Sequence, residues 1–121
     1  MMNKRKKVLI ADDDTGILDS IGMILEFEGY EVRTTTNGNS LLNLELDFPD
    51  ILLLDIWMSG IDGRDICRQL KQKESSRKIP IVMISASKDI EHSAIESGAD
   101  DFLAKPFELD DLLKIINKNI L

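Results

Sequence analysis

The chain has 121 residues, of which 43% are hydrophobic and 31% are charged, a size that fits one globular domain with one hydrophobic core and leaves no room for a second domain. Its formal net charge of -7 argues against nonspecific binding to nucleic acid or to an anionic membrane, because their phosphate groups repel an acidic protein. The basic start at Lys4–Lys7 precedes an apolar run of only Val8–Ala11, which is too short for a secretory signal or a membrane span, so we expect a soluble, cytoplasmic protein.

Short apolar runs along the chain predict five β-strands, because each run is bounded by polar or turn residues. The runs are Val8–Ala11, Val32–Thr35, Ile51–Leu54, Ile81–Ile84 and Phe102–Ala104. The middle run is apolar throughout, which is typical of a strand that is buried on both faces of a parallel sheet.

The segments that follow these runs have apolar residues at helical spacing. The stripes are Ile17, Ile21, Ile24 and Leu25 with the polar Glu28; Leu41, Leu42 and Leu46, between Asn37-Gly38 and Pro49; Ile66, Cys67 and Leu70; Ile90, Ala94 and Ile95; and Leu109, Leu112, Leu113, Ile116 and Ile120. Asp62 is the predicted N-cap of the third helix, and Gly29 and Gly98 are the predicted ends of the first and fourth. Strand and helix thus alternate five times, which predicts an α/β fold with a doubly wound parallel sheet, since a closed barrel needs about eight such units.

Charged residues follow three of the predicted strands: Asp12, Asp13 and Asp14 the first, Asp55 the third and Lys105 the fifth. In an open parallel sheet the carboxyl ends of the strands form one crevice, where such folds bind ligands. A pair of carboxylates about 4 Å apart costs about 4 kcal/mol at an effective dielectric of about 20, so the crevice requires a cation. Oxygen ligands of this kind suit Mg²⁺, and Lys105 supplies a second positive charge.

Acidic residues after a strand can also cap the next helix. We interpret Asp14 as such a cap, whereas Asp12 and Asp13 fit capping and metal ligation equally well. Asp55 does not precede an obvious helix start, and the segment Met58–Asp62 has the composition of an ordered loop. The carboxylate of Asp55 is therefore the one that a structural role explains least well.

Hydroxyl groups end the fourth strand. Ser87 fits a helix cap, while Ser85 lies at the strand end itself and is better placed to contact a ligand. The bond between Lys105 and Pro106 can be cis, which would fix the direction of the lysine. A dication site, a carboxylate, a hydroxyl and an ammonium together form a phosphoryl-binding set, because phosphoryl transfer needs positioning and charge neutralisation.

Two residues with reactive side chains fit structural roles better than chemical ones. Cys67, the only cysteine, excludes an internal disulfide and falls on the apolar stripe of the third helix, so we interpret it as a core residue. His92 lies in a polar stretch of the fourth helix, and we interpret it as a surface residue rather than a phosphodonor.

Four segments form a specific set in their order and separation: VLIADDD, PDILLLDIWMSGIDG, VMISAS and SGADDFLAKPF. Together they resemble the receiver domains of two-component response regulators, over nearly the whole chain. The resemblance implies a flavodoxin-like (βα)5 fold with strand order 2-1-3-4-5 and one receiver domain over residues 1–121. It also implies a phosphorelay signalling domain that is not an enzyme in the usual sense, because it catalyses only its own phosphorylation and dephosphorylation.

The resemblance assigns roles to the acidic residues. Asp55 matches the phosphoacceptor, which takes a phosphoryl group from a histidine kinase or a histidine phosphotransfer protein. Asp13 matches the direct Mg²⁺ ligand and Asp12 the neighbour that holds the ion largely through water, while Trp57 supplies its backbone carbonyl. Mn²⁺ can take the place of Mg²⁺.

The remaining roles concern switching. Lys105 matches the lysine that contacts the phosphoryl group, Ser85 the hydroxyl that reaches toward it, and Phe102 the aromatic switch. The face made by the fourth helix, the fifth strand and the fifth helix then changes shape and meets an output partner or effector domain. The domain itself is expected to contact neither nucleic acid nor membrane.

The chain departs from the family pattern at four positions. Ser59 replaces a common Pro, which makes the loop more flexible; Ser85 replaces Thr, which loosens its rotamer; and Phe102 replaces Tyr, which removes a hydroxyl. Trp57 is a bulky residue at a variable position that bears on water access to the acceptor. We predict a long-lived phosphoryl group on this account.

Two other classes share parts of this pattern. A Mg²⁺-dependent phosphohydrolase of the haloacid-dehalogenase kind requires D-x-D-G-T after the first strand, but residues 12–16 have Thr and Gly in the opposite order and the chain has no room for a cap. A flavodoxin-like flavin carrier requires a phosphate-binding loop there, but the aspartates of this loop would repel the flavin phosphate. A chain that stops at Leu121 fits both a stand-alone receiver and a piece of a longer regulator.

Overall fold

The computed structural model describes residues 5–43, 48–58, 60–86 and 90–120. Their elements are β1 Lys7–Ala11, α1 Thr15–Phe27, β2 Glu31–Thr35, the 3₁₀-helix η1 Gly38–Asn43, β3 Ile51–Asp55, β4 Trp57–Met58, β5 Ile61–Asp62, α2 Gly63–Gln72, β6 Ile81–Ser85, α3 Ile90–Ser97, β7 Asp101–Ala104 and α4 Leu109–Asn119. Within these ranges, no helix has the length and apolar character needed to cross a bilayer.

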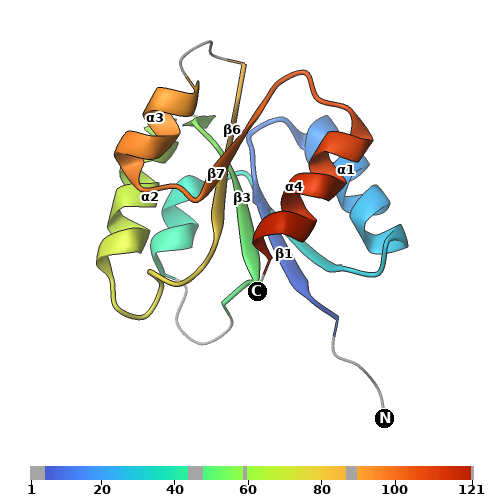
Figure 1. Cartoon of the computed structure of the whole chain (residues 1–121), viewed down its shortest axis with the longest axis horizontal. Coiled ribbons are helices and arrows are strands. Elements are labelled where there is room, and N and C mark those ends of the chain that lie inside the picture. The colour runs from blue at the N-terminus through green and yellow to red at the C-terminus, as the bar shows by residue number, and fades with distance from the viewer. Residues whose placement is uncertain (1–4, 44–47, 59, 87–89, 121) are drawn as a thin grey trace.

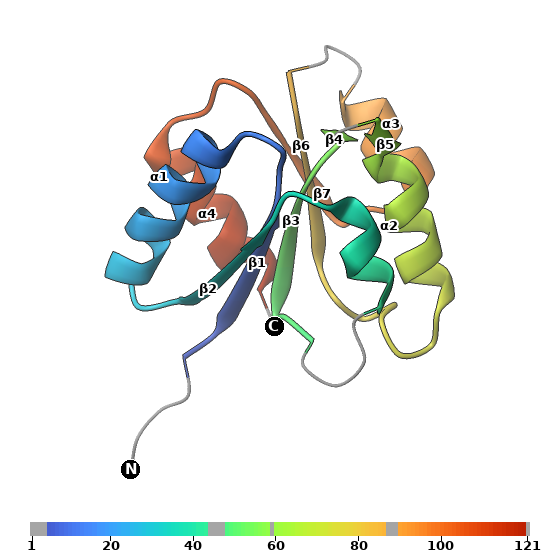
Figure 2. The same cartoon turned by 180° about the vertical axis from the view of Figure 1, so that it is seen from behind.

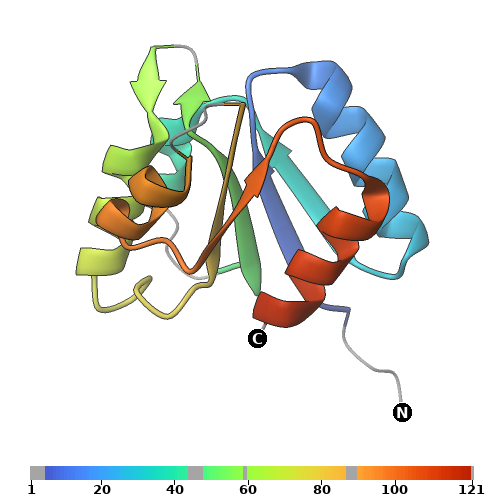
Figure 3. The same ribbon diagram turned by 45° about the horizontal axis from the view of Figure 1, so that its top comes forward.

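Five of the strands form one parallel sheet in the order β2-β1-β3-β6-β7. This order confirms the expected 2-1-3-4-5 arrangement, because β6 and β7 are the fourth and fifth strands of the repeat. Helices α1 and α4 cover one face of the sheet, and η1, α2 and α3 cover the other (Figures 1 and 2). The three layers are also visible in the tilted view of Figure 3. The doubly wound α/β fold is thereby confirmed.

The central strands are buried on both faces, and their side chains alternate between two cores. β3 and β6 are buried at every position. Leu52 and Leu54 pack in the core under η1, α2 and α3, whereas Ile51 and Leu53 pack under α1 and α4. Burial on both sides explains why these strands have continuous apolar sequences rather than alternating ones.

The predicted ends of the helices are largely correct. The Asp14 side chain accepts hydrogen bonds from the backbone N–H groups of Gly16 and Ile17 at the start of α1, and Asp62 accepts one from Arg64 N–H at the start of α2. Gly29 has a φ of 99° and Gly98 a φ of 87°, the left-handed conformation that glycine adopts most readily after a helix.

The second predicted helix is a 3₁₀-helix over Gly38–Asn43 in the part of the chain that the structure describes, with Leu41 buried and Leu46 outside the described residues. Polar side chains explain the tighter form. Asn37 Oδ1 accepts from Asn39 N–H, and Ser40 Oγ donates to the Asn37 carbonyl. Such local bonds compete with the regular α-helical pattern.

The apolar stripes are shifted in three helices. Glu28, the C-cap residue of α1, is exposed, and Leu18 is buried on this helix instead. Ile95 on α3 is 69% exposed and Leu109 on α4 is 41% exposed. The buried face of α3 is formed by Ile90, Ala94 and Ser97, which follow a spacing of four and then three residues. Ile95 therefore lies beside the buried stripe of this helix and not within it.

Candidate functional site

Four neighbouring strands end at the same edge of the sheet, and each brings one of the predicted residues there. Asp12 follows β1, Asp55 is the last residue of β3, Ser85 is the last residue of β6, and Lys105 follows β7. Lys105 N–H donates to the Ser85 carbonyl at 2.9 Å, which continues the pairing of β6 with β7 to this edge. The sheet therefore places these residues side by side.

Three carboxylates converge at this edge. Asp12, Asp13 and Asp55 each offer an oxygen atom, and these atoms all lie within 4.8 Å of one another. Asp12 and Asp55 are buried, while Asp13 is exposed. Because Asp14 caps α1, Asp12 and Asp13 are not needed as caps, and the cluster could hold a metal ion that prefers oxygen ligands.

The Lys105 ammonium reaches the cluster from the end of β7, an edge strand of the sheet. Its Nζ atom lies 3.0 Å from Asp12 Oδ2 and 3.8 Å from Asp55 Oδ2. The peptide bond between Lys105 and Pro106 is cis. Lys105 thus contacts two of the three carboxylates, Asp12 and Asp55, and the negative charge of these two exceeds its single positive charge.

The pKa of Asp55 reflects this imbalance. Burial of the carboxyl group and the neighbouring charge of Asp12 raise its pKa from 3.8 to about 6, and Asp13 adds to the effect. Lys105 and a hydrogen bond from the Trp57 backbone N–H act in the opposite direction. A cation bound beside Asp55 would therefore offset the repulsion between the carboxylates and stabilise the ionised form of Asp55.

A short hairpin follows Asp55, where the sequence indicated only an ordered loop. β4 and β5 pair antiparallel, with Trp57 opposite Asp62, and Gly60 between them has a φ of 79°. Gly63 N–H donates to the Ile56 carbonyl, so the start of α2 lies against the strand that carries Asp55. The two-residue connection through Ser59 and Gly60 was the available hairpin signal, although Ser59 itself lies outside the described residues.

Arg64 is a residue of this region that no pattern in the sequence indicated. Its guanidinium carbon lies 5.1 Å from the centre of the Trp57 ring, and its nitrogens form a two-point ion pair with Asp62. Trp57 is 58% exposed. The contact depends on the hairpin, which is why residue spacing alone did not reveal it.

The remaining predicted residues occupy three different environments. Ser85 is buried at the edge beside Lys105, and Phe102 is half-buried on β7, where it packs against the core under α2 and α3. Cys67 is buried and its pKa is raised by burial, in agreement with a core role. His92 is exposed and lies 3.1 Å from Glu96, and Ser87 lies outside the described residues.

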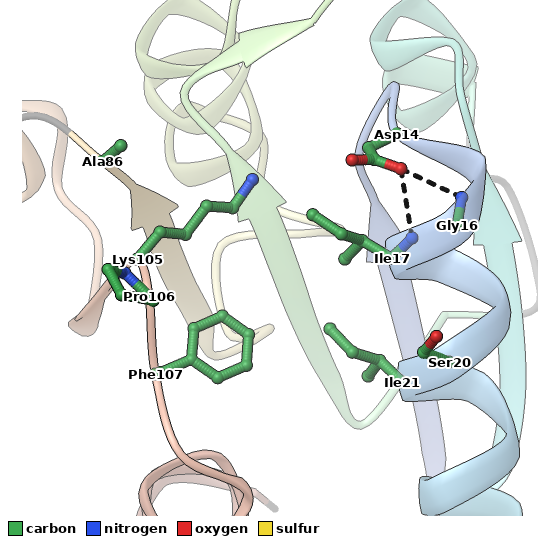
Figure 4. A pocket seen from close by; sticks show the side chains of 9 residues that line it. All are labelled: Asp14, Gly16, Ile17, Ser20, Ile21, Ala86, Lys105, Pro106 and Phe107. Carbon is green, nitrogen blue, oxygen red and sulfur yellow. Dashed lines mark hydrogen bonds between the residues drawn. The ribbon is translucent and has the colours of Figure 1, made fainter.

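A hollow of about 690 Å³ opens beside the cluster, between the start of α1 and the segment after β7. Figure 4 shows Lys105 and Phe107 on one side of it and Ile17 and Ile21 on the other, with Asp14 at its upper end. Most of its lining is apolar, and Asp14, Ser20 and Lys105 are its polar side chains. It therefore offers packing surface for another molecule next to the charged groups.

Comparison with known proteins identifies the family. The model of the response regulator receiver domain matches residues 8–117. This chain belongs to the response regulator receiver family. The receiver domain is 35% identical, over 111 residues, to the DNA-binding dual master transcriptional regulator RpaA of Synechocystis, a match that covers 88% of this chain and 46% of RpaA. The chain spans about half the length of the curated relatives it matches.

Solved structures agree with this assignment. A CheY-like response regulator receiver domain protein from Methanospirillum hungatei superposes with a TM-score of 0.85 at 32% identity, covering 95% of this chain and 93% of that one. The chemotaxis protein CheY4 of Vibrio cholerae gives a TM-score of 0.87 at 26% identity, covering 97% and 100%. Phosphoacceptor signalling is the function of this receiver domain, and the phosphohydrolase alternative is not supported.

Proposed function

We propose that Asp55 is the phosphoacceptor of this receiver domain and that residues 1–121 act as one receiver unit. The supporting observation is the position of the Asp55 carboxylate, which is buried at the sheet edge, close to oxygens of Asp12 and Asp13 and 3.8 Å from Lys105 Nζ. A pKa of about 6 leaves this carboxylate mostly ionised near neutral pH. The ionised form is the nucleophilic one.

The donor set fits Mg²⁺. Asp13 and Asp55 would hold the ion directly, Asp12 largely through water, and Trp57 through its backbone carbonyl; all are hard oxygen donors of the kind that this ion selects. Mn²⁺ prefers the same ligands and can replace it. When bound, the ion neutralises charge on the carboxylates and on the phosphoryl oxygens.

Phosphoryl transfer to Asp55 is a single displacement at phosphorus. A carboxylate oxygen of Asp55 forms the new O–P bond while the N–P bond of a phosphohistidine breaks, and its electron pair stays on the donor imidazole. Lys105 contributes a positive charge beside the transferred group, which stabilises the charge on its oxygens. The product is an acyl phosphate on Asp55, and its hydrolysis by water restores the free carboxylate.

The phosphorylated site is proposed to signal through α3, β7 and α4. The new dianion attracts Lys105 Nζ and the Ser85 hydroxyl, and Phe102 on β7 changes its packing as these groups move. Phosphorylation biases two pre-existing states through its different contacts in each. An output partner or effector domain then binds the altered face, in keeping with relatives about twice the length of this chain.

The phosphodonor is proposed to dock on the hollow beside Lys105. A histidine kinase or phosphotransfer protein must bring an imidazole to Asp55 and needs surface to pack against. Ile17, Ile21 and Phe107 provide apolar walls for that contact (Figure 4). The donor's phosphohistidine would then approach along the side on which Lys105 lies.

The proposal is tested by intact-protein mass spectrometry after incubation with acetyl phosphate and Mg²⁺. We expect one added phosphoryl group on the parent, none on Asp55→Asn, and one on Asp110→Asn, which makes the same change at an exposed position on α4. Retention of the added mass by Asp55→Asn would place the acceptor elsewhere. Chelation of Mg²⁺ should abolish the reaction in the parent, and undiminished labelling in chelator would exclude the metal requirement.

A further inference from the structure

The exposed indole of Trp57 is held by a two-part contact. The Arg64 guanidinium lies over the ring at 5.1 Å from its centre, within the range of a cation–π interaction. Arg64 is itself fixed by Asp62, whose Oδ1 accepts from Nε at 2.9 Å and whose Oδ2 accepts from Nη2 at 2.8 Å. This planar two-point pair sets the orientation of the guanidinium, which a lysine could not reproduce.

The backbone around Trp57 is already anchored by other contacts. Ile56 and Met58 are buried on either side of it, and the Trp57 N–H donates to the Asp55 carboxylate. Alternation along the strand directs the Trp57 side chain away from the core that holds Met58. The indole is thus the movable part of a residue whose backbone touches the acceptor, and Arg64 limits its movement.

We propose that Arg64 is a positioning residue, which holds the Trp57 indole at the rim of the acceptor site and thereby lengthens the life of phosphorylated Asp55. The inference rests on the proposed function of Asp55. The ion pair with Asp62 largely neutralises the charge of Arg64. Arg64 therefore acts by fixing the position of the indole and not by stabilising the charge of the phosphoryl group. Within the described residues, the Arg64 side chain contacts Asp62 and the Trp57 ring, and it reaches none of the three clustered carboxylates.

The step that Arg64 slows is hydrolysis of the acyl phosphate. A water oxygen attacks phosphorus, the bond between phosphorus and the Asp55 oxygen breaks, and the carboxylate keeps the electron pair. Inorganic phosphate leaves, and the proton of the attacking water passes to a phosphate oxygen or to solvent. A fixed apolar ring beside the acceptor reduces the number of waters that can approach, whereas a freely moving ring does not.

The experiment compares phosphoryl decay after removal of acetyl phosphate in the parent, Arg64→Ala and Arg68→Ala. Arg68 is the matched control, because it forms a similar ion pair with Asp65 on the same helix. We expect decay to be about two- to fivefold faster in Arg64→Ala, the factor that loss of an exposed cation–π contact corresponds to, and unchanged in Arg68→Ala. In a Trp57→Asn background, Arg64→Ala should have no further effect.

A second readout does not depend on phosphorylation. Trp57 is the only tryptophan, so its fluorescence anisotropy reports the movement of the indole directly, and it should fall in Arg64→Ala but not in Arg68→Ala. Asp62→Asn is a second variant, which serves if Arg64→Ala folds poorly. It keeps a residue that caps helices well but removes the ion pair, so it should also lower the anisotropy and speed the decay.

The outcomes separate this inference from the function on which it rests. A parent that accepts no phosphoryl group overturns the proposed function, and the role of Arg64 with it. A phosphorylated parent with equal decay in Arg64→Ala, or with the same acceleration in the Trp57→Asn background, overturns only the role of Arg64. Unchanged anisotropy in Arg64→Ala also overturns it.

Discussion

The Lys105 ammonium is closer to Asp12 than to the proposed acceptor, at 3.0 Å against 3.8 Å. Before phosphorylation it therefore mainly balances Asp12, and Asp55 is left with a raised pKa. A phosphoryl group on Asp55 brings about two negative charges and three strong acceptor oxygens to the same place. The lysine then has a stronger partner than Asp12, which gives the site a direct electrostatic reason to rearrange.

Trp57 should control the stability of the acyl phosphate. We expect Trp57→Asn to lose its phosphoryl group about three to ten times faster than the parent, because a small polar side chain admits water where the indole excludes it; the range corresponds to about 1 kcal/mol in the barrier. The measurement is the first-order decay of labelled protein at fixed pH and Mg²⁺. Phe27→Asn, which removes another exposed aromatic ring at the end of α1, should decay at the parental rate, and decay of Trp57→Asn that is unchanged or slower would contradict the idea.

At the scale of elements, the position of the acceptor depends on the close approach of α2 to β3. A Cβ atom on Gly63 would lie 2.4 Å from the Asp55 carbonyl oxygen and 3.1 Å from the Ile56 Cα. Both are backbone atoms of the strand end and cannot move aside as a flexible side chain could. Glycine is required here because of contact distance, and the hairpin β4–β5 is closed by the same residue through its bond to Ile56.

Gly63→Ala should therefore weaken both the fold and the site. We expect a loss of about 1 to 3 kcal/mol in the free energy of unfolding, the usual cost of overpacking, and slower phosphorylation by acetyl phosphate because the Asp55 backbone is displaced. Urea unfolding and the rate of mass gain measure the two effects. Gly22→Ala is the matched control: its added Cβ meets only Val32 Cγ1 at 3.8 Å, and alanine in a helix interior should stabilise the domain by up to about 1 kcal/mol. Equal stability of the two variants would show that the strand end yields.

The elements also show which parts of the structure could be predicted from the sequence. The residues at the strand ends could be predicted, because Asp12, Asp55 and Lys105 each follow an apolar run and a parallel sheet brings such ends together. The hairpin had only one local signal, the Ser59-Gly60 connection, since two-residue strands have no detectable period. The contact between Trp57 and Arg64 depends on that hairpin and had no signal of its own. The exposure of Ile95 was missed for a related reason: in a helix as short as Ile90–Ser97, one apolar residue beside the stripe cannot be told from one within it.

At the scale of the whole molecule, the site makes a charge-dependent contribution to folding. The chain carries a net charge of -7, and three of its carboxylates are gathered at one edge. Folding moves Asp55 from water into this cluster, so in the absence of a metal ion the ionised carboxylate opposes folding. A bound divalent ion should reverse the effect, because any ligand that binds only the native state stabilises it by mass action.

This opposition predicts how stability depends on pH in chelator. The pKa of Asp55 is about 6 in the folded protein and 3.8 in its ordinary environment, so the folded state binds the proton more tightly. Protonated Asp55 favours the native state below about pH 4, and this contribution is lost as the pH rises through about 6. The free energy of unfolding of the parent, minus that of Asp55→Asn, should fall by about 1 to 2 kcal/mol between pH 4 and pH 7.5.

Urea unfolding of both proteins at several pH values measures this difference directly. Asp101→Asn is a control of opposite sign: burial acts to raise the pKa of Asp101, but hydrogen bonds from Asn119 and Phe102 N–H and the charge of Lys118 outweigh it and lower the pKa. Its contribution is present above the ordinary pKa and is lost as the pH falls, so the difference between the parent and Asp101→Asn should rise with pH. A pH-independent difference for Asp55→Asn would mean that Asp55 is not held in a charged, partly desolvated cluster.

In saturating Mg²⁺ at pH 7.5, the parent should gain stability while Asp55→Asn gains less, because the variant lacks one of the proposed oxygen ligands.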